Sequence, residues 1–296
     1  MTLESISKCP VCSSTSFQPF LTCKDFTTTG EHFNIIKCSS CSFLITSPRP
    51  PQSEIGKYYQ SDNYISHTGG SKNLFDRIYL LARSYSITRK RKLIESFASK
   101  GSLLDYGTGT GEFLNHCSKN DWNCEGVEPS DEARTKAKNI SQLTVYQTIN
   151  EIQGNKYDAV TLWHVLEHIH DLNKTLTDLV GRLNEHGVLF IAIPNPESYD
   201  AKKYNEHWAA YDVPRHLWHF NKESITNLLK QNGLTLVDIK PMKLDSFYVS
   251  LLSEGYKDPT LSKLIQLIRA FSTGLLSNWK GKREMNFSSL IYIAKR

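Results

Sequence analysis

The chain has 296 residues, of which 39% are hydrophobic and 22% are charged, and its formal net charge is +5. This length allows one full α/β domain with a smaller appendage, because the apolar residues suffice for one large core. Acidic and basic residues are interleaved, which excludes a surface that binds polyanions over its whole extent. Nucleic acid is therefore permitted as a partner but is not favoured.

The N-terminal residues do not resemble a secretory signal. Residues 1–5 lack a basic segment, and no apolar segment follows them. The longest apolar run, residues 188–193, is too short to span a bilayer. We therefore expect a cytoplasmic protein without a membrane partner, and the sequence leaves its oligomeric state open.

Four of the seven cysteines form two Cys-x-x-Cys pairs near the N-terminus. Cys9 and Cys12 make the first pair, Cys38 and Cys41 make the second, and twenty-five residues separate the pairs. This spacing is typical of a zinc ribbon, in which the four thiolates occupy the corners of a tetrahedron. Four thiolates leave zinc no open position, so the predicted site is structural. A disulfide or redox motif is the alternative, which is less favoured because the rest of the chain is typical of the cytosol.

A proline-rich segment at residues 47–53 interrupts regular structure and marks the first boundary. Residues 54–100 are rich in aromatic residues and in apolar residues at helical spacing, which predicts a helical lid. The basic cluster at residues 89–92 could bind nucleic acid, but a short charge run beside an amphipathic stripe favours a solvated face. The predicted parts are a zinc-ribbon module at residues 1–47, a linker and helical lid at residues 48–100, and an α/β domain at residues 101–296.

From residue 101 onward, apolar strand candidates alternate with helical segments. This alternation predicts a parallel sheet with helices on both faces, and ligands of such sheets bind at the carboxyl ends of the strands. The strand candidates lie at residues 103–106, 124–127, 159–162, 188–193, 235–239 and 289–296.

Three glycines follow the first of these strands at alternate positions. Gly107, Gly109 and Gly111 form a Gly-x-Gly-x-Gly pattern, with Asp105 just inside the strand and a helical segment behind. Such a turn brings backbone N–H groups and a helix N-terminus against a ligand. The dinucleotide fingerprint needs Gly-x-Gly-x-x-Gly, and a phosphate-binding loop needs a following Gly-Lys-Ser/Thr, so both are excluded. The stretch instead resembles motif I of the class I S-adenosylmethionine-dependent methyltransferases.

Three further segments resemble motifs of this methyltransferase family, in the family's order. Glu128 ends the second strand candidate, where a carboxylate can bind both ribose hydroxyls of the cofactor. Residues 157–172 resemble the fourth strand and its loop, and residues 182–198 resemble the fifth strand. The resemblance covers roughly residues 100–240 and implies a Rossmann-like, seven-stranded, mostly parallel sheet. It implies S-adenosylmethionine as the cofactor, bound by Asp105, Tyr106, Gly107, Thr108, Gly109, Gly111, Glu128, Pro129, Trp163 and His164.

The sequence is also similar to the ubiquinone-biosynthesis O-methyltransferases, a small-molecule branch of the family. In those enzymes the segment that matches residues 164–168 carries Glu, Glu and His, which hold a divalent metal. Glu167 and His168 match here, but His164 stands at the first position. These three residues lie on one helical face and could hold a second metal. Capping and packing roles are the alternative, which we favour.

Aromatic and charged residues crowd residues 207–224, after the fifth strand. In similar methyltransferases an insertion at this place lines the acceptor pocket. Packing of the aromatic residues and a structural Asp212–Arg215 pair are the alternative. Asn221 is a predicted helix N-cap, with Glu223 in the first turn. The predicted substrate-binding residues are Trp208, Tyr211, Asp212, Arg215 and His219.

The resemblance implies methyl transfer to a small-molecule acceptor, and a hydroxyl group of a biosynthetic intermediate is favoured. A hydroxyl acceptor loses a proton, and His216 and His168 are the candidate catalytic bases, because a histidine with a pKa of about 6.5 can accept it. An RNA or protein methyltransferase that grips its substrate with the ribbon is the alternative. A scaffold that binds the cofactor without turnover is a third hypothesis.

Overall fold

The computed structural model describes residues 3–59 and 74–296, with side chains from residue 82 onward in the second range. A seven-stranded sheet forms the centre of the molecule, with the strand order β10-β11-β8-β7-β4-β5-β6. β11 runs antiparallel to both of its neighbours, and the other neighbouring pairs are parallel. The strands are β4 (Ser102–Tyr106), β5 (Asn123–Val127), β6 (Val145–Tyr146), β7 (Tyr157–Trp163), β8 (Leu183–Pro194), β10 (Thr235–Pro241) and β11 (Ser289–Lys295).

The predicted mostly parallel sheet is therefore confirmed, and each of the six strand candidates lies within or overlaps a strand. The short edge strand β6 was not predicted, because its two residues are too few to show an apolar run. Asn221 caps the following helix as predicted, since its side chain accepts a hydrogen bond from the Ser224 backbone N–H at 2.8 Å.

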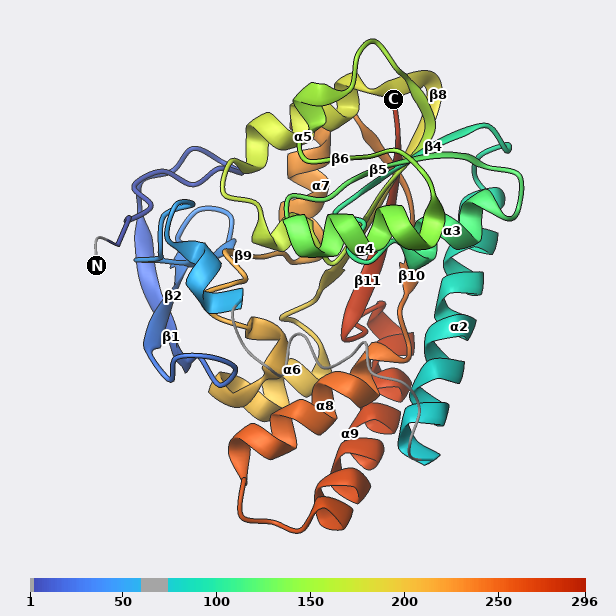
Figure 1. The fold of residues 1–296 in the computed structure, drawn as a ribbon. Helices are drawn as coiled ribbons and strands as arrows, with labels where there is room; N and C mark the ends of the chain where they lie inside the picture. Colours follow the sequence, from blue (N-terminus) through green and yellow to red (C-terminus); the bar gives the residue numbers. More distant parts are fainter. Residues whose placement is uncertain (1–2, 60–73) are drawn as a thin grey trace.

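Helices cover both faces of the central sheet (Figure 1). Two of the three clusters of buried hydrophobic residues lie on opposite faces of this sheet, because alternate residues of each strand point to opposite faces. One face packs against α2 (Leu74–Glu95), α3 (Glu112–Ser118) and α4 (Asp131–Ser141). The other packs against α5 (Leu172–Gly181) and α7 (Lys222–Gln231).

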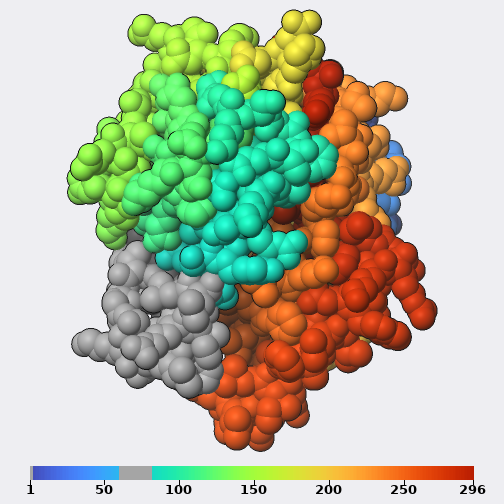
Figure 2. All heavy atoms as spheres, turned by 90° about the vertical axis from the view of Figure 1, so that its right-hand side faces the viewer, coloured from blue at the N-terminus to red at the C-terminus, as the bar shows by residue number. Residues whose placement is uncertain are grey.

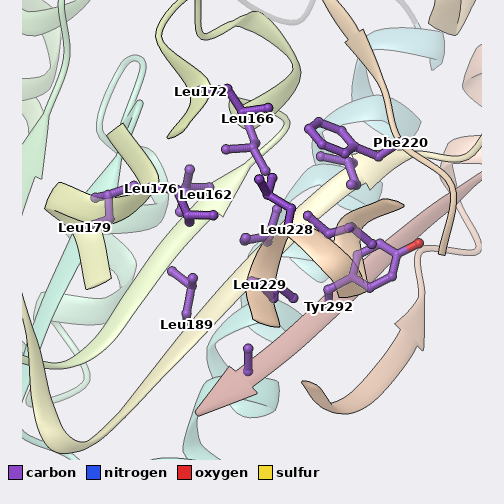
Figure 3. Packing of buried hydrophobic residues seen from close by; sticks show 14 of the residues in the cluster. Leu162, Leu166, Leu172, Leu176, Leu179, Leu189, Phe220, Leu228, Leu229 and Tyr292 are labelled. Carbon is purple, nitrogen blue, oxygen red and sulfur yellow. The ribbon is translucent and has the colours of Figure 1, made fainter. Parts of the chain in front are cut away.

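The second face has a leucine-rich core, which Figure 3 shows from close by. Leu162 and Leu189 project from β7 and β8, and the leucines of α5 and α7 pack onto them. In α5 the buried residues include Leu172, Leu176 and Leu179, at the spacing of one helical face. This packing fixes β7 and the loop that follows it, which carries several of the predicted site residues.

A second, four-stranded sheet lies at the N-terminal side of the molecule (Figure 1). Its strands pair antiparallel in the order β1-β2-β3-β9. They are β1 (Phe17–Lys24), β2 (His32–Cys38), β3 (Leu44–Thr46) and β9 (Trp218–His219). The fourth strand thus comes from the stretch at residues 207–224, far along the chain.

The remaining segments are helical. Four short 3-10 helices border the site, namely η1 (Ile55–Tyr59), η4 (Leu166–His168), η5 (Asn205–His207) and η6 (Ala209–Tyr211). α6 (Tyr199–Tyr204) leads into η5, and α8 (Asp245–Lys257) and α9 (Lys263–Glu284) form a helical hairpin at the bottom of Figure 1. In the described part of the chain, no helix has both the length and the apolar character needed to cross a bilayer.

Of the expected lid, the structure describes η1 and α2. Residues 60–73 of the expected lid, which include two adjacent glycines at positions 69 and 70, lie outside the described residues. α2 contributes Ile94 to the core beside β4 and α3, so its C-terminal half is part of the packed domain. A role of this segment as a lid stays a prediction.

Candidate active site

The glycine turn lies at the carboxyl end of β4, where it leads into α3. Gly107 and Gly111 have φ angles of 76° and 80°, in the region that glycine adopts without strain. A Cβ at Gly107 would come within 2.5 Å of the Val165 side chain, and one at Gly111 within 2.8 Å of the Ala137 backbone. Gly109 has a φ of 55°, and a Cβ there would meet no atom within 4 Å. The outer two glycines therefore allow close packing, whereas the middle one faces open space.

Two carboxylates flank this turn. Glu128, just beyond β5, accepts hydrogen bonds from the backbone N–H groups of Gly109 at 2.8 Å and Ser130 at 2.9 Å. Asp105 is buried at the end of β4 and accepts a hydrogen bond from the Thr161 hydroxyl at 2.6 Å. Burial raises the pKa of Asp105 to about 6. A buried acid with a raised pKa beside an open turn is typical of a functional site.

Trp163 and Lys90 lie near the turn, on the face covered by α2 and α3. Trp163 packs edge-on against Phe113 of α3, with ring centroids 5.4 Å apart. The ammonium group of Lys90, from α2, lies 4.5 Å from the centre of the indole ring. The Trp163 indole nitrogen is buried and has no hydrogen-bond partner among the described residues. A buried donor without a partner is costly, which fits a ligand that accepts this hydrogen bond.

His164 follows Trp163 and is held between two carboxylates. Its Nε2 lies 3.1 Å from Asp245 Oδ2, and its Nδ1 lies 3.4 Å from Glu167 Oε1. Burial opposes the charged form of His164, but the hydrogen bonds to Asp245 and Glu167 raise its pKa to about 9. An imidazolium has no lone pair for a metal, so the geometry does not favour the metal set of His164, Glu167 and His168, which the sequence left as the less favoured alternative to capping and packing roles.

A different set of side chains could hold a cation at this place. Glu167, His168 and His216 each offer one ligand atom, and these atoms lie within 4.8 Å of one another. The Glu167 carboxylate is buried, and apart from the 3.4 Å contact of its Oε1 with His164 Nδ1 neither oxygen has a hydrogen-bond partner among the described residues. Two imidazoles and a carboxylate are a donor set that suits divalent transition metals. The residues present therefore fit a cation, with His216 in place of His164.

The two candidate bases, His168 and His216, lie together. Their ring centroids are 4.5 Å apart, and the rings meet edge to face. His168 Nδ1 lies 3.0 Å from the Arg215 carbonyl, and His216 Nδ1 lies 2.8 Å from the Ala210 carbonyl. A carbonyl only accepts, so each Nδ1 carries the proton and each Nε2 keeps a lone pair. Burial and, to a smaller extent, the neighbouring His216 lower the pKa of His168 to about 4.

The predicted substrate-binding residues form a largely buried seam between the four-stranded sheet and the helices α6 and α8. Trp208 donates its indole N–H to Asp200 at 2.8 Å, and its ring packs edge-on against Tyr211. Thr46 donates its hydroxyl to the His216 carbonyl and lies 3.0 Å from His219 Nε2, so this nitrogen of His219 donates to Thr46. These contacts are those expected if the residues pack and pair within the protein. A role of these residues in substrate binding stays a prediction.

Arg215 is the centre of this seam. Its side chain is 1% exposed and binds both oxygens of Asp212, at 2.6 Å and 2.9 Å. It also donates to Asp25 Oδ1 at 3.1 Å and to the Tyr58 carbonyl at 2.8 Å. Asp25 itself is fully buried and accepts three backbone N–H groups of the turn that follows it. One guanidinium therefore ties the insertion after β8 to two segments of the N-terminal part.

The four cysteines of the two Cys-x-x-Cys pairs come together. Cys9 and Cys41 have sulfur atoms 3.6 Å apart, and those of Cys12 and Cys38 are 3.5 Å apart. All four sulfurs lie within 4.8 Å of one another. Tetrahedral zinc with bonds of about 2.3 Å places its sulfur ligands about 3.8 Å apart. The arrangement therefore has the size of a closed, four-thiolate metal site.

Several residues of the site carry no local sequence signal. Lys90 belongs to a basic cluster that the sequence assigned to a solvated face, and Asp245, the partner of His164, lies eighty-one residues beyond it. Asp25 and Tyr58, the partners of Arg215, are single residues outside any motif. Tyr59 OH lies 3.0 Å from His168 Nδ1. No local pattern marks these residues, because their partners lie on segments that are distant in the sequence.

Comparison with known proteins gives one family. A family model described as a methyltransferase domain matches residues 79–239, which is more than half of the chain. No curated protein matches the chain.

Solved structures resemble the chain at low sequence identity. The magnesium protoporphyrin IX methyltransferase (ChlM) of Synechocystis PCC 6803 with bound SAH has a TM-score of 0.54 and 14% identity, covering 83% of this chain and all of that one. The same protein with bound SAM has a TM-score of 0.50 and 13% identity, covering 82% of this chain and 96% of that one. Mycolic acid cyclopropane synthase CmaA1, complexed with SAH and CTAB, has a TM-score of 0.50 and 13% identity, covering 71% of this chain and 84% of that one. These likenesses show the fold.

Proposed function

We propose that this chain, which belongs to the methyltransferase domain family, transfers a methyl group from S-adenosylmethionine to a hydroxyl group of a small-molecule acceptor. The observation that carries the proposal is the glycine turn. Its middle glycine faces open space, and Glu128 is held at its rim by the Gly109 N–H. The turn matches neither the Gly-x-Gly-x-x-Gly of dinucleotide sites nor the Gly-Lys-Ser/Thr of a phosphate-binding loop, and this fits a cofactor whose tail is an amino acid.

The remaining cofactor contacts follow from the positions of the side chains. Glu128 is proposed to bind the ribose hydroxyls, because it lies where two neighbouring parallel strands end. The unpartnered indole N–H of Trp163 is proposed to donate to the bound cofactor. Asp105, Tyr106, Thr108, Pro129 and His164 are proposed to line the same site.

When bound, S-adenosylmethionine supplies an activated methyl group, so the protein has to align the acceptor and exclude water. His168 and His216 present Nε2 lone pairs beside each other, and we propose that one of them accepts the hydroxyl proton. If a cation occupies Glu167, His168 and His216, the same lone pairs become its ligands. A bound cation would then lower the pKa of the acceptor hydroxyl.

The acceptor class is proposed from the relatives of the fold. The similar structures are a magnesium protoporphyrin IX methyltransferase and a mycolic acid cyclopropane synthase, which are named for a porphyrin and a mycolic acid and not for RNA or protein. For the four cysteines we propose structural zinc, because the sulfur spacings fit it and thiolate is the ligand that zinc prefers in closed sites.

Methyl-deuterated S-adenosylmethionine tests the proposal. The protein is incubated with it and with fractionated cell extract, and the small-molecule, RNA and protein fractions are examined by mass spectrometry. We expect the trideuteromethyl group in the small-molecule fraction, on an oxygen. Label in RNA or protein would favour a macromolecular substrate instead, and cofactor binding without label in any fraction would favour a scaffold.

A further inference from the structure

The outward face of α9 carries large apolar side chains. Leu264, Ile268, Phe271, Leu275 and Trp279 are each between 50% and 68% exposed. Their spacing of three or four residues places them on one face of the helix. We call these five residues the outer stripe. Because soluble proteins rarely leave a contiguous apolar patch of this extent in water, the outer stripe needs a partner.

The inward face of the same helix has the opposite character. Its buried residues are small, namely Ala270, Thr273, Gly274, Ser277 and Gly281. They let α9 lie close against α8, where a Cβ at Gly274 would come within 2.5 Å of the Phe247 ring. Packing within the molecule therefore uses the small residues of α9 and leaves its large apolar residues outside. Ordinary surface helices have the reverse arrangement.

Basic residues border the outer stripe. Lys263 precedes it, Arg269 lies beside it, and Lys280, Lys282 and Arg283 follow its last residue. The guanidinium of Arg283 lies 5.3 Å from the centre of the Trp279 ring. On α9 these five cations stand against one acidic residue, Glu284, and one of the five, Arg269, also pairs with Asp258 at 3.1 Å. An apolar face with aromatic residues and cationic borders is typical of a helix that lies in the interface of an anionic bilayer.

The hairpin of α8 and α9 is attached directly to the candidate active site. Asp245, the first residue of α8, is the residue that lies 3.1 Å from His164. The Ala209 backbone N–H, in η6 of the buried seam, donates to the Ser253 hydroxyl of α8 at 2.9 Å. Figure 2 shows the orange and red atoms of this hairpin at the bottom and lower right of the view. The outer stripe therefore belongs to a hairpin whose other helix, α8, contacts the candidate active site directly.

We propose that the outer stripe of α9 docks on a lipid bilayer with anionic phospholipid headgroups, and that the methyl acceptor is an amphiphile resident in that bilayer. The second statement rests on the proposed function, whereas the first does not. A second copy of the chain fits less well, because a symmetric pairing of α9 helices would bring their cationic borders together.

Vesicle flotation tests the docking without cofactor or acceptor. The full chain is mixed with vesicles of phosphatidylcholine alone or of phosphatidylcholine with phosphatidylglycerol. We expect binding to the anionic vesicles that weakens as salt is added, because the cationic borders are screened. Equal binding to both vesicles, or binding to neither, would overturn the proposal.

Two sets of substitutions test whether the outer stripe is the surface that binds the vesicles. Phe271→Ser with Leu275→Ser and Trp279→Gln should lower vesicle affinity at least about tenfold, since each change removes apolar surface that would enter the lipid. Each of these side chains is at least half exposed, and the Phe271 ring lies 5.4 Å from that of Phe247, so the melting temperature should change little. The matched control is Ile140→Ser with Val237→Ser, two exposed apolar residues elsewhere, which should leave vesicle affinity unchanged. An outer-stripe variant that binds as the wild type does would contradict the proposal.

Trp279 gives a second readout, because it is 57% exposed whereas Trp122, Trp208 and Trp218 are buried. Its fluorescence should shift to shorter wavelength on anionic vesicles, and Trp279→Phe should remove the shift. Sedimentation velocity tests the alternative that the outer stripe binds a second copy of the chain. If the wild type is a dimer that the outer-stripe substitutions dissociate, and it does not bind vesicles, the stripe is a dimer interface and the proposal is wrong. Vesicle binding without methyl transfer would refute the proposed function and leave the docking intact.

Discussion

The cofactor end of the molecule and the buried seam are built in different ways. At the cofactor end, the glycine turn, Asp105 and Glu128 lie within twenty-four residues of one another, and backbone N–H groups hold the carboxylate of Glu128. In the seam, Arg215 joins Asp25 and Tyr58, which precede it by more than one hundred and fifty residues. The first region depends on local chain geometry, and the second on side chains that meet only after folding.

This difference predicts different responses to substitution. Changes in the seam should alter stability and the order of the N-terminal part, because buried charges and the metal site hold it in place. Changes at the cofactor end should alter ligand binding with smaller effects on stability.

The largest effect is expected at the four-cysteine site. Elemental analysis should find about one zinc per chain, because the four thiolates form one closed site, and Cys38→Ser should lose it together with the hydrogen-exchange protection of β1 to β3. The free energy of structural zinc binding is on the order of 10 kcal/mol, so the four-stranded sheet should not survive its loss. Cys23→Ser, outside the cluster, should retain the zinc. Protein that is fully folded without zinc would refute this assignment.

Arg215→Met should be the most destabilising single change in the seam. It leaves the carboxylate of Asp25 buried without its cation, which costs about 3 to 5 kcal/mol of the free energy of unfolding. Urea denaturation measures the loss. The control is Lys174→Met, which breaks an exposed pair with Asp178 and should cost at most about 1 kcal/mol. Equal effects of the two substitutions would show that the seam does not depend on this ion pair.

Asp105, which is buried at the cofactor end, should make the stability of the protein depend on pH. Its pKa is raised from 3.8 to about 6, so between these values the folded protein binds more protons than the unfolded chain, and the free energy of unfolding falls as pH rises through this window. Asp105→Asn should remove this dependence and stabilise the protein at neutral pH by on the order of 2 kcal/mol. Denaturation at several pH values measures both. A variant that is less stable than the wild type at neutral pH would contradict the account.

The two regions also differ in how far the sequence predicts them. The spacing of Gly107, Gly109 and Gly111 after an apolar strand predicts the turn, because glycine φ angles and strand order are local properties. The apolar runs likewise predict six strands of the central sheet. β9 was missed, because two residues carry no period and its pairing with β3 is decided by the folded chain. Arg215 was predicted to contact substrate, whereas its buried partners could be found only in three dimensions.

Binding of S-adenosylmethionine, measured by calorimetry, is the sharpest test of the proposed cofactor site. We expect one site per chain, and Glu128→Ala should weaken binding there by more than about 1.4 kcal/mol, or tenfold, through loss of the ribose hydrogen bonds. Glu132→Ala, an exposed acid of α4 close by, should leave the affinity unchanged. Cys38→Ser should keep the affinity within about threefold if the cofactor end is independent of the metal site. Tight binding of NADH with none of S-adenosylmethionine would contradict the account.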